Sequence, residues 1–225
     1  MLSRIGHITA VVTTPMMLNF FQAVAQFITP DNPYFRQWVE LEWTDISYPL
    51  AFKVPSPLHI AAFAGMTKYA QLLLDQGYCV DDLDGDERTP LHWACGRGHI
   101  NMVALLLENH AEPNSEDYRG SKPIHGAARK DYFEIVRLLL KAGVDPDTPK
   151  TRENHRHKRL KGGEKSTKGE TAVQYVSVQG HGNTLLEMLP YLKRETLEEL
   201  LCRCCLHGKS DLVRIILDNS DFGLC

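Results

Sequence analysis

The sequence contains no apolar run long enough to cross a bilayer. A transmembrane helix needs about 20 consecutive apolar residues, and polar or charged residues interrupt every apolar stretch of this chain before that length. The sequence also has no Asn-x-Ser/Thr acceptor and only six cysteines, scattered over 225 residues. Scattered cysteines at small apolar positions are typical of reduced thiols inside the cell. We therefore expect an intracellular, cytoplasmic protein with no membrane partner.

The sequence also has little net charge. The formal charge is −3 at pH 7, which implies no general affinity for nucleic acid. This balance conceals one basic stretch, because residues 150–168 contain eight Lys or Arg against two Glu. Since that stretch carries +6, the rest of the chain carries −9. We predict an acidic body with one basic loop inserted at 150–168.

The basic loop admits three interpretations. Its central cations are Arg156, Lys158, Arg159 and Lys161. Such a run is typical of a nuclear-import signal or a phosphate-contacting patch, and equally of a soluble insertion with no partner. It contains no aromatic residue on which a base could stack, which argues against sequence-selective nucleic-acid binding. The nucleus stays open as a second compartment.

Residues 1–54 show no internal repeat. Apolar helical patterns run over Met16–Ile28 and Phe35–Trp43, separated by a turn at Pro30–Pro33. We predict that 1–54 form an amino-terminal helical cap or linker. Met1–Ile28 leans apolar, with a basic residue near its start, but several polar residues interrupt it. A secretory signal peptide is therefore retained only as an alternative.

From residue 55 onward the sequence repeats itself every 33 residues. Three phrases recur at this interval: Ser56-Pro57-Leu58-His59, Thr89-Pro90-Leu91-His92 and Lys122-Pro123-Ile124-His125. Triple-leucine runs beginning at Leu72, Leu105 and Leu138 keep the same spacing. A fixed period of this length is the sequence signature of stacked repeats. Each unit of such a stack packs only against its neighbours.

The second unit shows how the pattern specifies two helices. Thr89 suits an N-cap position, and Pro90 suits the first helical position because its missing N–H has no partner there anyway. Leu91, Ala94 and Cys95 follow at helical spacing and face inward. Gly98 ends the helix by taking a left-handed conformation. A second helix is expected over Ile100–Asn109, burying Val103, Leu106 and Leu107, and residues 112–121 form the loop to the next unit.

Two positions depart from the repeat. His110 stands where the first and third units have Gly77 and Gly143, and Asp131 stands where the other units have glycine. These turns call for a backbone conformation that glycine adopts most readily. We expect both residues to tolerate the tight turn less well.

The Pro-Leu-His phrases and triple-leucine helices resemble the ankyrin repeat. The resemblance implies an all-α solenoid of helix-turn-helix units joined by hairpin loops, over about residues 55–220. It also implies that the histidine of each phrase ties neighbouring units together by hydrogen bonding to backbone. More divergent copies begin at Thr171 and near Cys202. We therefore expect about five units, with the basic loop between the third and the fourth.

Several strings imitate catalytic or metal-binding motifs. Cys202-Arg203-Cys204-Cys205 offers metal ligands, but these cysteines coincide with buried small-residue positions of the repeat, so core packing explains them better than zinc. Residues 162–167 lack the glycine placement of a P-loop. His59, His92 and His125 fall in separate units, which disfavours a catalytic relay. We expect no enzyme activity, no cofactor and no metal.

The resemblance also implies where a partner binds. Ankyrin arrays bind partners on a concave face made of hairpin tips and first helices. Projected onto this chain, that face includes Trp93, Arg97, Tyr118, Arg119, Arg129 and Tyr175. Trp93 and Tyr118 are favoured as anchors because aromatic side chains are enriched among the residues that dominate interface energetics. For Trp93 and Tyr175, packing against the preceding unit is the alternative. The predicted function is a non-enzymatic scaffold that binds another protein.

A narrower resemblance concerns residues 57–66 and their Trp- and Tyr-bearing lead-in. This junction is similar to that of fungal NACHT-type, NLR-like proteins, in which a nucleotide-binding switch domain precedes an ankyrin sensor array. It implies a sensor region of a signalling NTPase as one alternative. A nuclear adaptor whose basic loop contacts import machinery or nucleic acid is another. Because no polar cap follows Leu217, we expect a monomer or a part of a longer chain.

Overall fold

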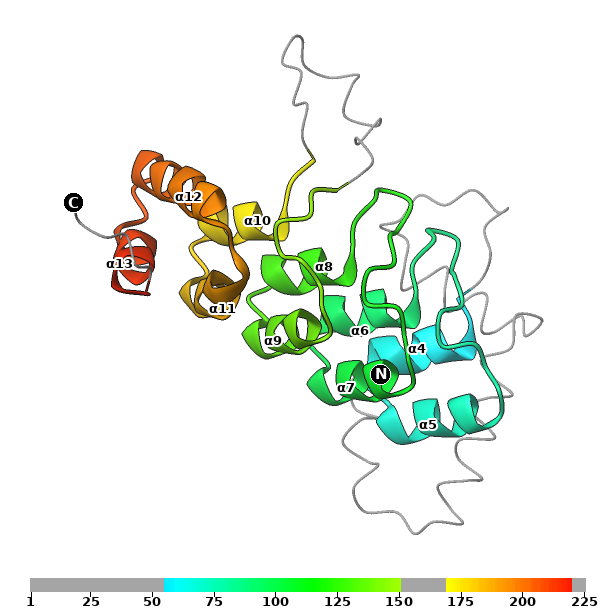
Figure 1. Ribbon diagram of the computed structural model, residues 1–225. Helices are drawn as coiled ribbons and strands as arrows, with labels where there is room; N and C mark the ends of the chain where they lie inside the picture. Colours follow the sequence, from blue (N-terminus) through cyan, green and yellow to red (C-terminus); the bar gives the residue numbers. More distant parts are fainter. Residues whose placement is uncertain (1–54, 151–168, 220–225) are drawn as a thin grey trace.

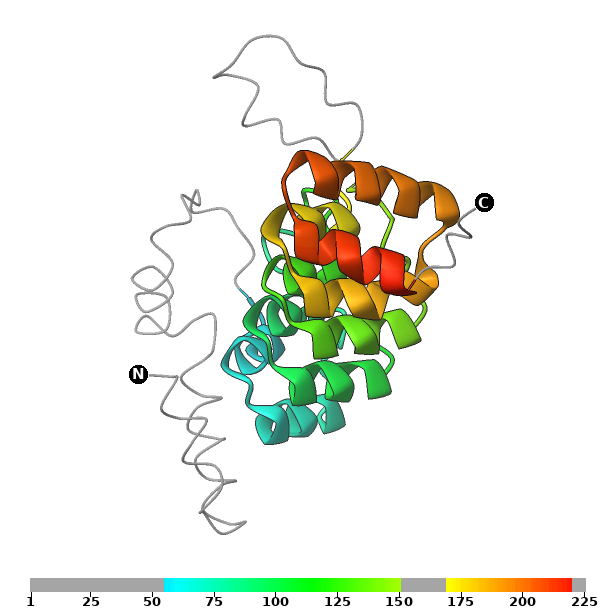
Figure 2. The same ribbon diagram turned by 90° about the vertical axis from the view of Figure 1, so that its left-hand side faces the viewer.

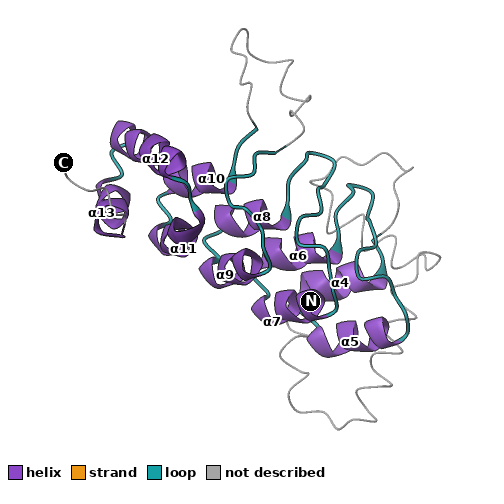
Figure 3. Ribbon diagram, in the orientation of Figure 1, coloured by secondary structure: helices purple, strands orange, loops and turns teal. Residues whose placement is uncertain are grey.

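The computed structural model describes residues 55–150 and 169–219, and the regular elements within these ranges are helices (Figure 3). The predicted cap at 1–54 and residues 151–168 of the predicted basic loop lie outside the described residues. The helices come in five consecutive pairs: α4 (Pro57–Ala64) and α5 (Thr67–Asp75), α6 (Pro90–Arg97) and α7 (Ile100–Glu108), α8 (Pro123–Arg129) and α9 (Phe133–Lys141), α10 (Ala172–Gln179) and α11 (Gly182–Met188), α12 (Arg194–Leu206) and α13 (Ser210–Asn219). A 3-10 turn, η2 (Leu189–Tyr191), follows α11.

The pairs stack into two parallel rows of helices. The first helices of the pairs form one row and the second helices form the other, and successive pairs follow each other along the stack (Figures 1 and 2). Each helix packs against its counterpart in the next pair, as α4 does on α6 and α5 on α7. The loops after α5 and α7 extend from the side of the first-helix row (Figure 1). The predicted helix-turn-helix units are confirmed.

The second pair shows why these residues form these helices. Thr89 is the N-cap of α6 in an extended conformation, and Pro90 is the first helical residue. The small buried residues Ala94 and Cys95 allow close packing of neighbouring helices. Gly98 ends α6 with a φ of 82°, and its N–H donates to the Ala94 carbonyl (3.1 Å). These features confirm the prediction for the first helix of the unit.

The second helix of this pair differs slightly from expectation. It ends at Glu108 rather than at residue 109. Val103 and Leu106 are buried as predicted, together with Met102, but Leu107 is only half-buried. The core of the array therefore lies between the two rows and between successive pairs.

Histidines at the start of the first helices join each unit to the loop of the next. The Ser56 amide donates to Nδ1 of His59 (3.2 Å), so the ring proton sits on Nε2, which donates to the Arg88 carbonyl (2.8 Å). His92 repeats this arrangement one unit later, with its Nε2 donating to the Ser121 carbonyl (2.9 Å). The predicted structural role of these histidines is confirmed.

A second set of contacts joins the units at the turn between paired helices. Nε2 of His99 donates to the Phe63 carbonyl (2.9 Å), and the ring lies over Gly65 so closely that a Cβ there would come within 2.8 Å of it. Where Asp131 replaces glycine, its carboxylate accepts from the Thr184 hydroxyl (2.6 Å). The turn between paired helices is thus itself a contact between neighbouring units.

One prediction about the cysteines is wrong. Cys95 and Cys204 are buried, but Cys79, Cys202 and Cys205 are exposed. Cys205 occupies the position of Cys95 in the repeat, yet within 55–150 and 169–219 no further helix pair packs over α12 as α8 packs over α6. For the same reason Leu206 is 85% exposed.

The two turns at which the sequence predicts backbone strain do adopt the left-handed conformation. His110 and Asp131 have φ values of 64° and 58°, in the left-handed region. A third residue, Glu87, has a φ of 59° and stands one repeat before Gly120. A side chain at such a φ costs roughly 1–2 kcal/mol.

Replacing His110 by glycine should stabilise the array. His110 is exposed, so the substitution removes unfavourable φ strain without removing a buried contact. The extra freedom of glycine in the unfolded chain offsets part of the gain, leaving about 0.5–1 kcal/mol. Urea denaturation of His110→Gly measures the effect. The control Glu108→Gly lies on the adjacent helical turn and should destabilise; a loss of stability in both variants would contradict the assignment.

Candidate functional site

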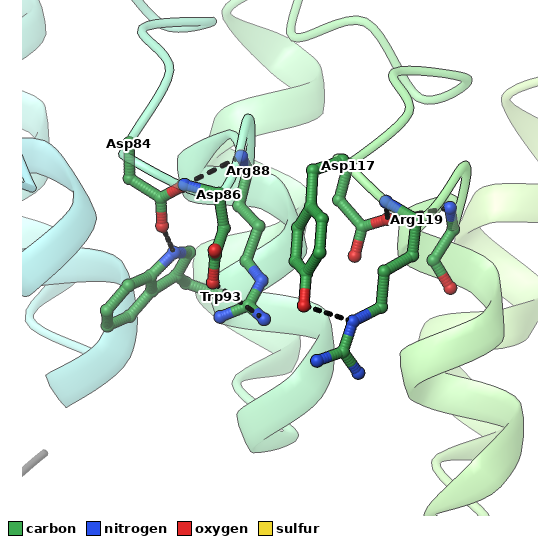
Figure 4. Close-up of polar contacts among 8 residues, drawn as sticks. Asp84, Asp86, Arg88, Trp93, Asp117 and Arg119 are labelled. Atoms are coloured by element: carbon green, nitrogen blue, oxygen red, sulfur yellow. Dashed lines mark hydrogen bonds and ion pairs between the residues drawn. The ribbon is translucent and has the colours of Figure 1, made fainter. Parts of the chain in front are cut away.

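The loop before α6 is organised by one buried carboxylate. Oδ1 of Asp84 accepts from the backbone amides of Asp86 (2.8 Å) and Arg88 (2.9 Å). Its Oδ2 accepts from the indole N–H of Trp93 (2.8 Å), and Figure 4 shows the indole lying against this loop. Asp84 is only 7% exposed. It therefore holds the loop and the Trp93 ring in one arrangement.

The next loop repeats the device 33 residues later. Oδ1 of Asp117 accepts from the amides of Arg119 (2.9 Å) and Ser121 (2.8 Å). The Tyr118 amide donates to the Asp86 carbonyl (2.9 Å), so the two loops are joined directly. Sequence reasoning missed both aspartates, although their spacing by one repeat length was a usable signal.

Trp93 packs against the preceding unit. The indole is half-buried and meets the Phe63 ring edge-on, with centroids 5.5 Å apart, and the His59 ring at 6.0 Å. The Arg97 guanidinium lies 3.8 Å above the Phe63 ring, a cation–π contact that leaves its N–H groups available. Trp93 thus forms a fixed wall of the face, as the alternative interpretation of this residue anticipated.

Tyr175 forms a comparable wall at the other side. Its ring meets the His125 ring edge-on at 6.5 Å, which is again a contact with the preceding unit. Its hydroxyl accepts from Nζ of Lys150 (2.5 Å) and donates to the Glu170 carboxylate. Burial and the hydrogen bond with Glu170 raise the pKa of Tyr175. Burial is also the main reason that the pKa of Lys150 is lowered.

A hollow of about 290 Å³ is lined by both walls. Gly96 of α6 and Gly126 of α8 also line it, and a Cβ added to Gly126 would lie 3.6 Å from the Gly96 Cα. Five of the six predicted partner-binding residues line the hollow: Trp93, Arg97, Arg119, Arg129 and Tyr175. The sixth, Tyr118, lies beside it, its ring 4.9 Å from the Arg119 guanidinium. The structure therefore gathers the predicted residues on one face.

The hollow is strongly cationic. Six basic residues line it against the single carboxylate of Asp117, namely Arg88, Arg97, Arg119, Lys122, Arg129 and Lys150. Arg88 is paired with Asp86 at 3.1 Å (Figure 4). Arg97, Arg119 and Arg129 are exposed, and each lacks a carboxylate partner among residues 55–150 and 169–219. Of the predicted basic loop, Arg156, Lys158, Arg159 and Lys161 lie outside the described residues.

Comparison with known proteins agrees with this geometry. The family model for ankyrin repeats (3 copies) matches residues 42–117 and 58–150. The crystal structure of the human ASB11 ankyrin repeat domain superimposes with a TM-score of 0.57 and 24% identity, over 73% of this chain and 69% of that one. The chain folds as an ankyrin-repeat array. The comparison with curated proteins gave no match, whereas 457 chains of solved structures match, so the fold by itself points to no single partner.

Ankyrin repeats are in general protein-interaction scaffolds, and the described part of this array carries little that suggests other chemistry. Residues 55–150 and 169–219 contain no group of three or more His, Cys, Asp or Glu placed to hold a metal ion. None of the helices described is both long enough and apolar enough for a bilayer. The exposed cysteines of α12 do not gather into a metal site.

The third ankyrin unit departs from the histidine pattern at the edge of the hollow. Nδ1 of His125 accepts from the Lys122 amide (3.0 Å), but its buried Nε2 makes no well-formed hydrogen bond within the described residues. The Thr148 backbone is close enough to interact only weakly. Burial, reinforced by the Lys150 charge, lowers the pKa of His125 to about 4. The ring therefore stays neutral in the folded array.

This pKa predicts that acid destabilises the array through His125. The unfolded chain has a histidine pKa of about 6.5. Between that pH and about pH 4, His125 binds a proton in the unfolded state but not in the folded state. The free energy of unfolding therefore has its full value above about pH 6.5 and falls as the pH decreases to about 4. The loss amounts to roughly 3 kcal/mol at most. Urea denaturation across this pH range measures it.

His125→Gln should reduce this pH dependence without unfolding the third unit. Gln174 occupies the same position in the fourth unit, where its Oε1 accepts from the Thr171 amide (3.4 Å). His207→Gln, at an exposed site, is the matched control. An unchanged slope of stability against pH in His125→Gln would show that other groups cause the acid sensitivity.

Proposed function

We propose that this chain is a non-enzymatic module that binds another protein through its concave face. That face consists of the first helices α6, α8 and α10 together with the loops that carry Asp84 and Asp117. The observation that carries the proposal is the gathering of three exposed arginines, Arg97, Arg119 and Arg129, around a hollow between two packed aromatic rings. Arginine and aromatic side chains dominate the energetics of protein interfaces.

The rigidity of the face supports this role. Asp84 and Asp117 tie their loops with hydrogen bonds of 2.8–2.9 Å to four backbone amides. Trp93 and Tyr175 are held by ring contacts and by polar partners before any protein arrives. A preorganised surface avoids part of the ordering cost of association. Partner recognition then falls mainly to the exposed arginines, with the aromatic rings as fixed walls.

Two narrower roles are compatible with this proposal. In the first, the array is the sensor of a NACHT-type signalling NTPase, which a P-loop upstream in the full gene would support. In the second, the protein is an intracellular adaptor that enters the nucleus and whose basic loop contacts import machinery or nucleic acid. The Lys150 amide donates to the Glu170 carbonyl (3.3 Å), so the two flanks of that loop lie together. Salt-dependent DNA binding that disappears when residues 151–168 are deleted would support the adaptor.

Reversing the three exposed arginines should abolish partner binding and preserve the fold. The triple variant Arg97→Glu/Arg119→Glu/Arg129→Glu breaks no carboxylate pair within the described residues. The matched control Lys68→Glu/Lys141→Glu/Arg214→Glu makes the same charge change at exposed positions of the second helices. Proximity labelling with the intact chain and both variants, after circular dichroism has shown that each folds, identifies the partners.

Proteins captured by the intact chain and the control, but not by the triple variant, would support the concave face as the binding site. Proteins captured equally by all three would place binding elsewhere on the chain. In that case the proposed function of this face would be wrong.

A further inference from the structure

We propose that the hollow between Trp93 and Tyr175 binds an acidic peptide segment of the partner protein, with carboxylate side chains placed above Gly96 and Gly126. This inference rests on the proposed function, because it specifies the chemistry of the partner that the concave face accepts. Four observations carry it: the charge of the hollow, its arginines without a carboxylate partner in residues 55–150 and 169–219, its glycine floor, and a buried histidine that lacks the hydrogen bond made by its counterparts in the first two units.

The charge of the hollow is opposite to that of the protein. Six cations and one carboxylate line it, although the chain as a whole carries −3. That carboxylate belongs to Asp117, whose Oδ1 is already occupied by two backbone amides. Field lines concentrate in clefts lined by charges of one sign, which attracts ligands of the opposite sign. The charge of the hollow therefore favours an acidic segment.

The arginines are available for a ligand without the loss of an existing ion pair. Arg97 extends from α6, Arg119 from the loop before α8, and Arg129 from the end of α8. None has a carboxylate partner in the described ranges 55–150 and 169–219. An arginine can bind a carboxylate through two parallel hydrogen bonds. Several such groups spaced along one hollow suit several carboxylates spaced along a peptide.

The glycines at the floor are required neither by the backbone nor by packing. Neither Gly96 nor Gly126 has a positive φ, and a Cβ at Gly96 would meet nothing within 4 Å. A Cβ at Gly126 would make only an ordinary contact. Glycine within a helix costs about 0.5–1 kcal/mol relative to alanine. The neighbouring units place Trp93 and Tyr175 at the repeat position of Gly126, so this unit keeps open the space that its neighbours fill with aromatic rings.

The wall of the hollow contains a histidine that departs from the regular pattern of the array. His125 lines the hollow, and its buried Nε2 makes no well-formed hydrogen bond within the described part of the chain. In the two preceding units this atom donates to a carbonyl at 2.8 and 2.9 Å. Burial is also the largest cause that lowers the pKa of Lys150; Glu170 and Asp117 oppose this effect, and Arg129 and Arg119 reinforce it. A bound carboxylate would add a negative charge beside the cations of Lys150, Arg119 and Arg129.

The shape of the site favours a peptide over nucleic acid. The hollow is lined from Phe63 in the first unit to Tyr175 in the fourth, so a ligand extends across several helices. Binding of single-stranded nucleic acid relies on aromatic rings as stacking platforms. Both rings here already contact another ring, Trp93 that of Phe63 and Tyr175 that of His125.

Fluorescence anisotropy with the full chain tests the proposal directly. The probe is a labelled peptide of about 12 residues with alternating Glu and Gly, long enough when extended to cross the hollow at about 3.3 Å per residue. Its twin has Gln in place of Glu. We expect the Glu peptide to bind and the Gln peptide not to bind. Arg97→Glu/Arg129→Glu should weaken binding by about tenfold or more, and Lys68→Glu/Lys141→Glu should leave it unchanged.

Two glutamate substitutions separate the hollow from charge in general. Gly126→Glu should abolish binding, because its own carboxylate occupies the space among the arginines. The matched control Gln76→Glu adds the same charge at an exposed position after α5, outside the hollow, and should bind the peptide like the parent. Circular dichroism must show both variants folded. If a folded Gly126→Glu binds the peptide as tightly as Gln76→Glu does, the hollow is not the site.

Three further outcomes would overturn the proposal. The first is binding that is lost in Arg156→Gln/Lys158→Gln/Arg159→Gln/Lys161→Gln but kept in Arg97→Glu/Arg129→Glu, since the peptide would then bind the basic loop. The second is displacement of the peptide by inorganic phosphate at matched ionic strength, which would indicate a small-anion site. The third is a partner protein that depends on the three arginines but is not displaced by the Glu peptide. That result would leave the proposed function intact and exclude only the acidic-peptide chemistry.

Discussion

The hydrogen bond from a histidine side chain to the backbone of the next unit is the interaction on which this structure depends. His59 and His92 each donate through Nε2 to the carbonyl just before the following N-cap. Because a buried N–H without a partner costs about 1–3 kcal/mol, this geometry fixes the spacing between a helix pair and the next loop. The loop in turn delivers the side chains of the concave face, so the core contact and the binding surface are set by the same bond.

The amino-acid sequence was sufficient to predict the repeat, and insufficient to predict the hollow. Phrases such as Thr89-Pro90-Leu91-His92 determine helix starts through local backbone chemistry, which acts identically in every unit. Cys205 failed as a predicted core residue because its burial depends on a neighbour stacked over α12, not on its own helix. For Trp93, the sequence left two roles open: a partner-binding anchor, or packing against the preceding unit. Its hydrogen bond to Asp84 and its ring contact with Phe63 show the packing.

The hollow could not be predicted from the sequence because it forms where two adjacent helices, α6 and α8, each have a glycine in place of a side chain. Gly96 and Gly126 are 30 residues apart, so they hold different places in the repeat and no period connects them. They become neighbours only when α6 packs on α8, which brings the Cα of Gly96 to within 3.6 Å of where a Gly126 Cβ would stand. The arginines were visible as candidates from their residue type. Their lack of acidic partners is a property of the folded array alone.

The third unit shows where stability and recognition conflict. The Nδ1 of its histidine accepts from the Lys122 amide as in the first two units, but within the described residues its Nε2 makes no well-formed hydrogen bond. Its first helix also carries a glycine that neither φ nor packing requires. Both features lower stability, and both face the same cationic hollow. In a repeat protein each unit is held by its neighbours on both sides, so a central unit can tolerate such losses better than an end unit could.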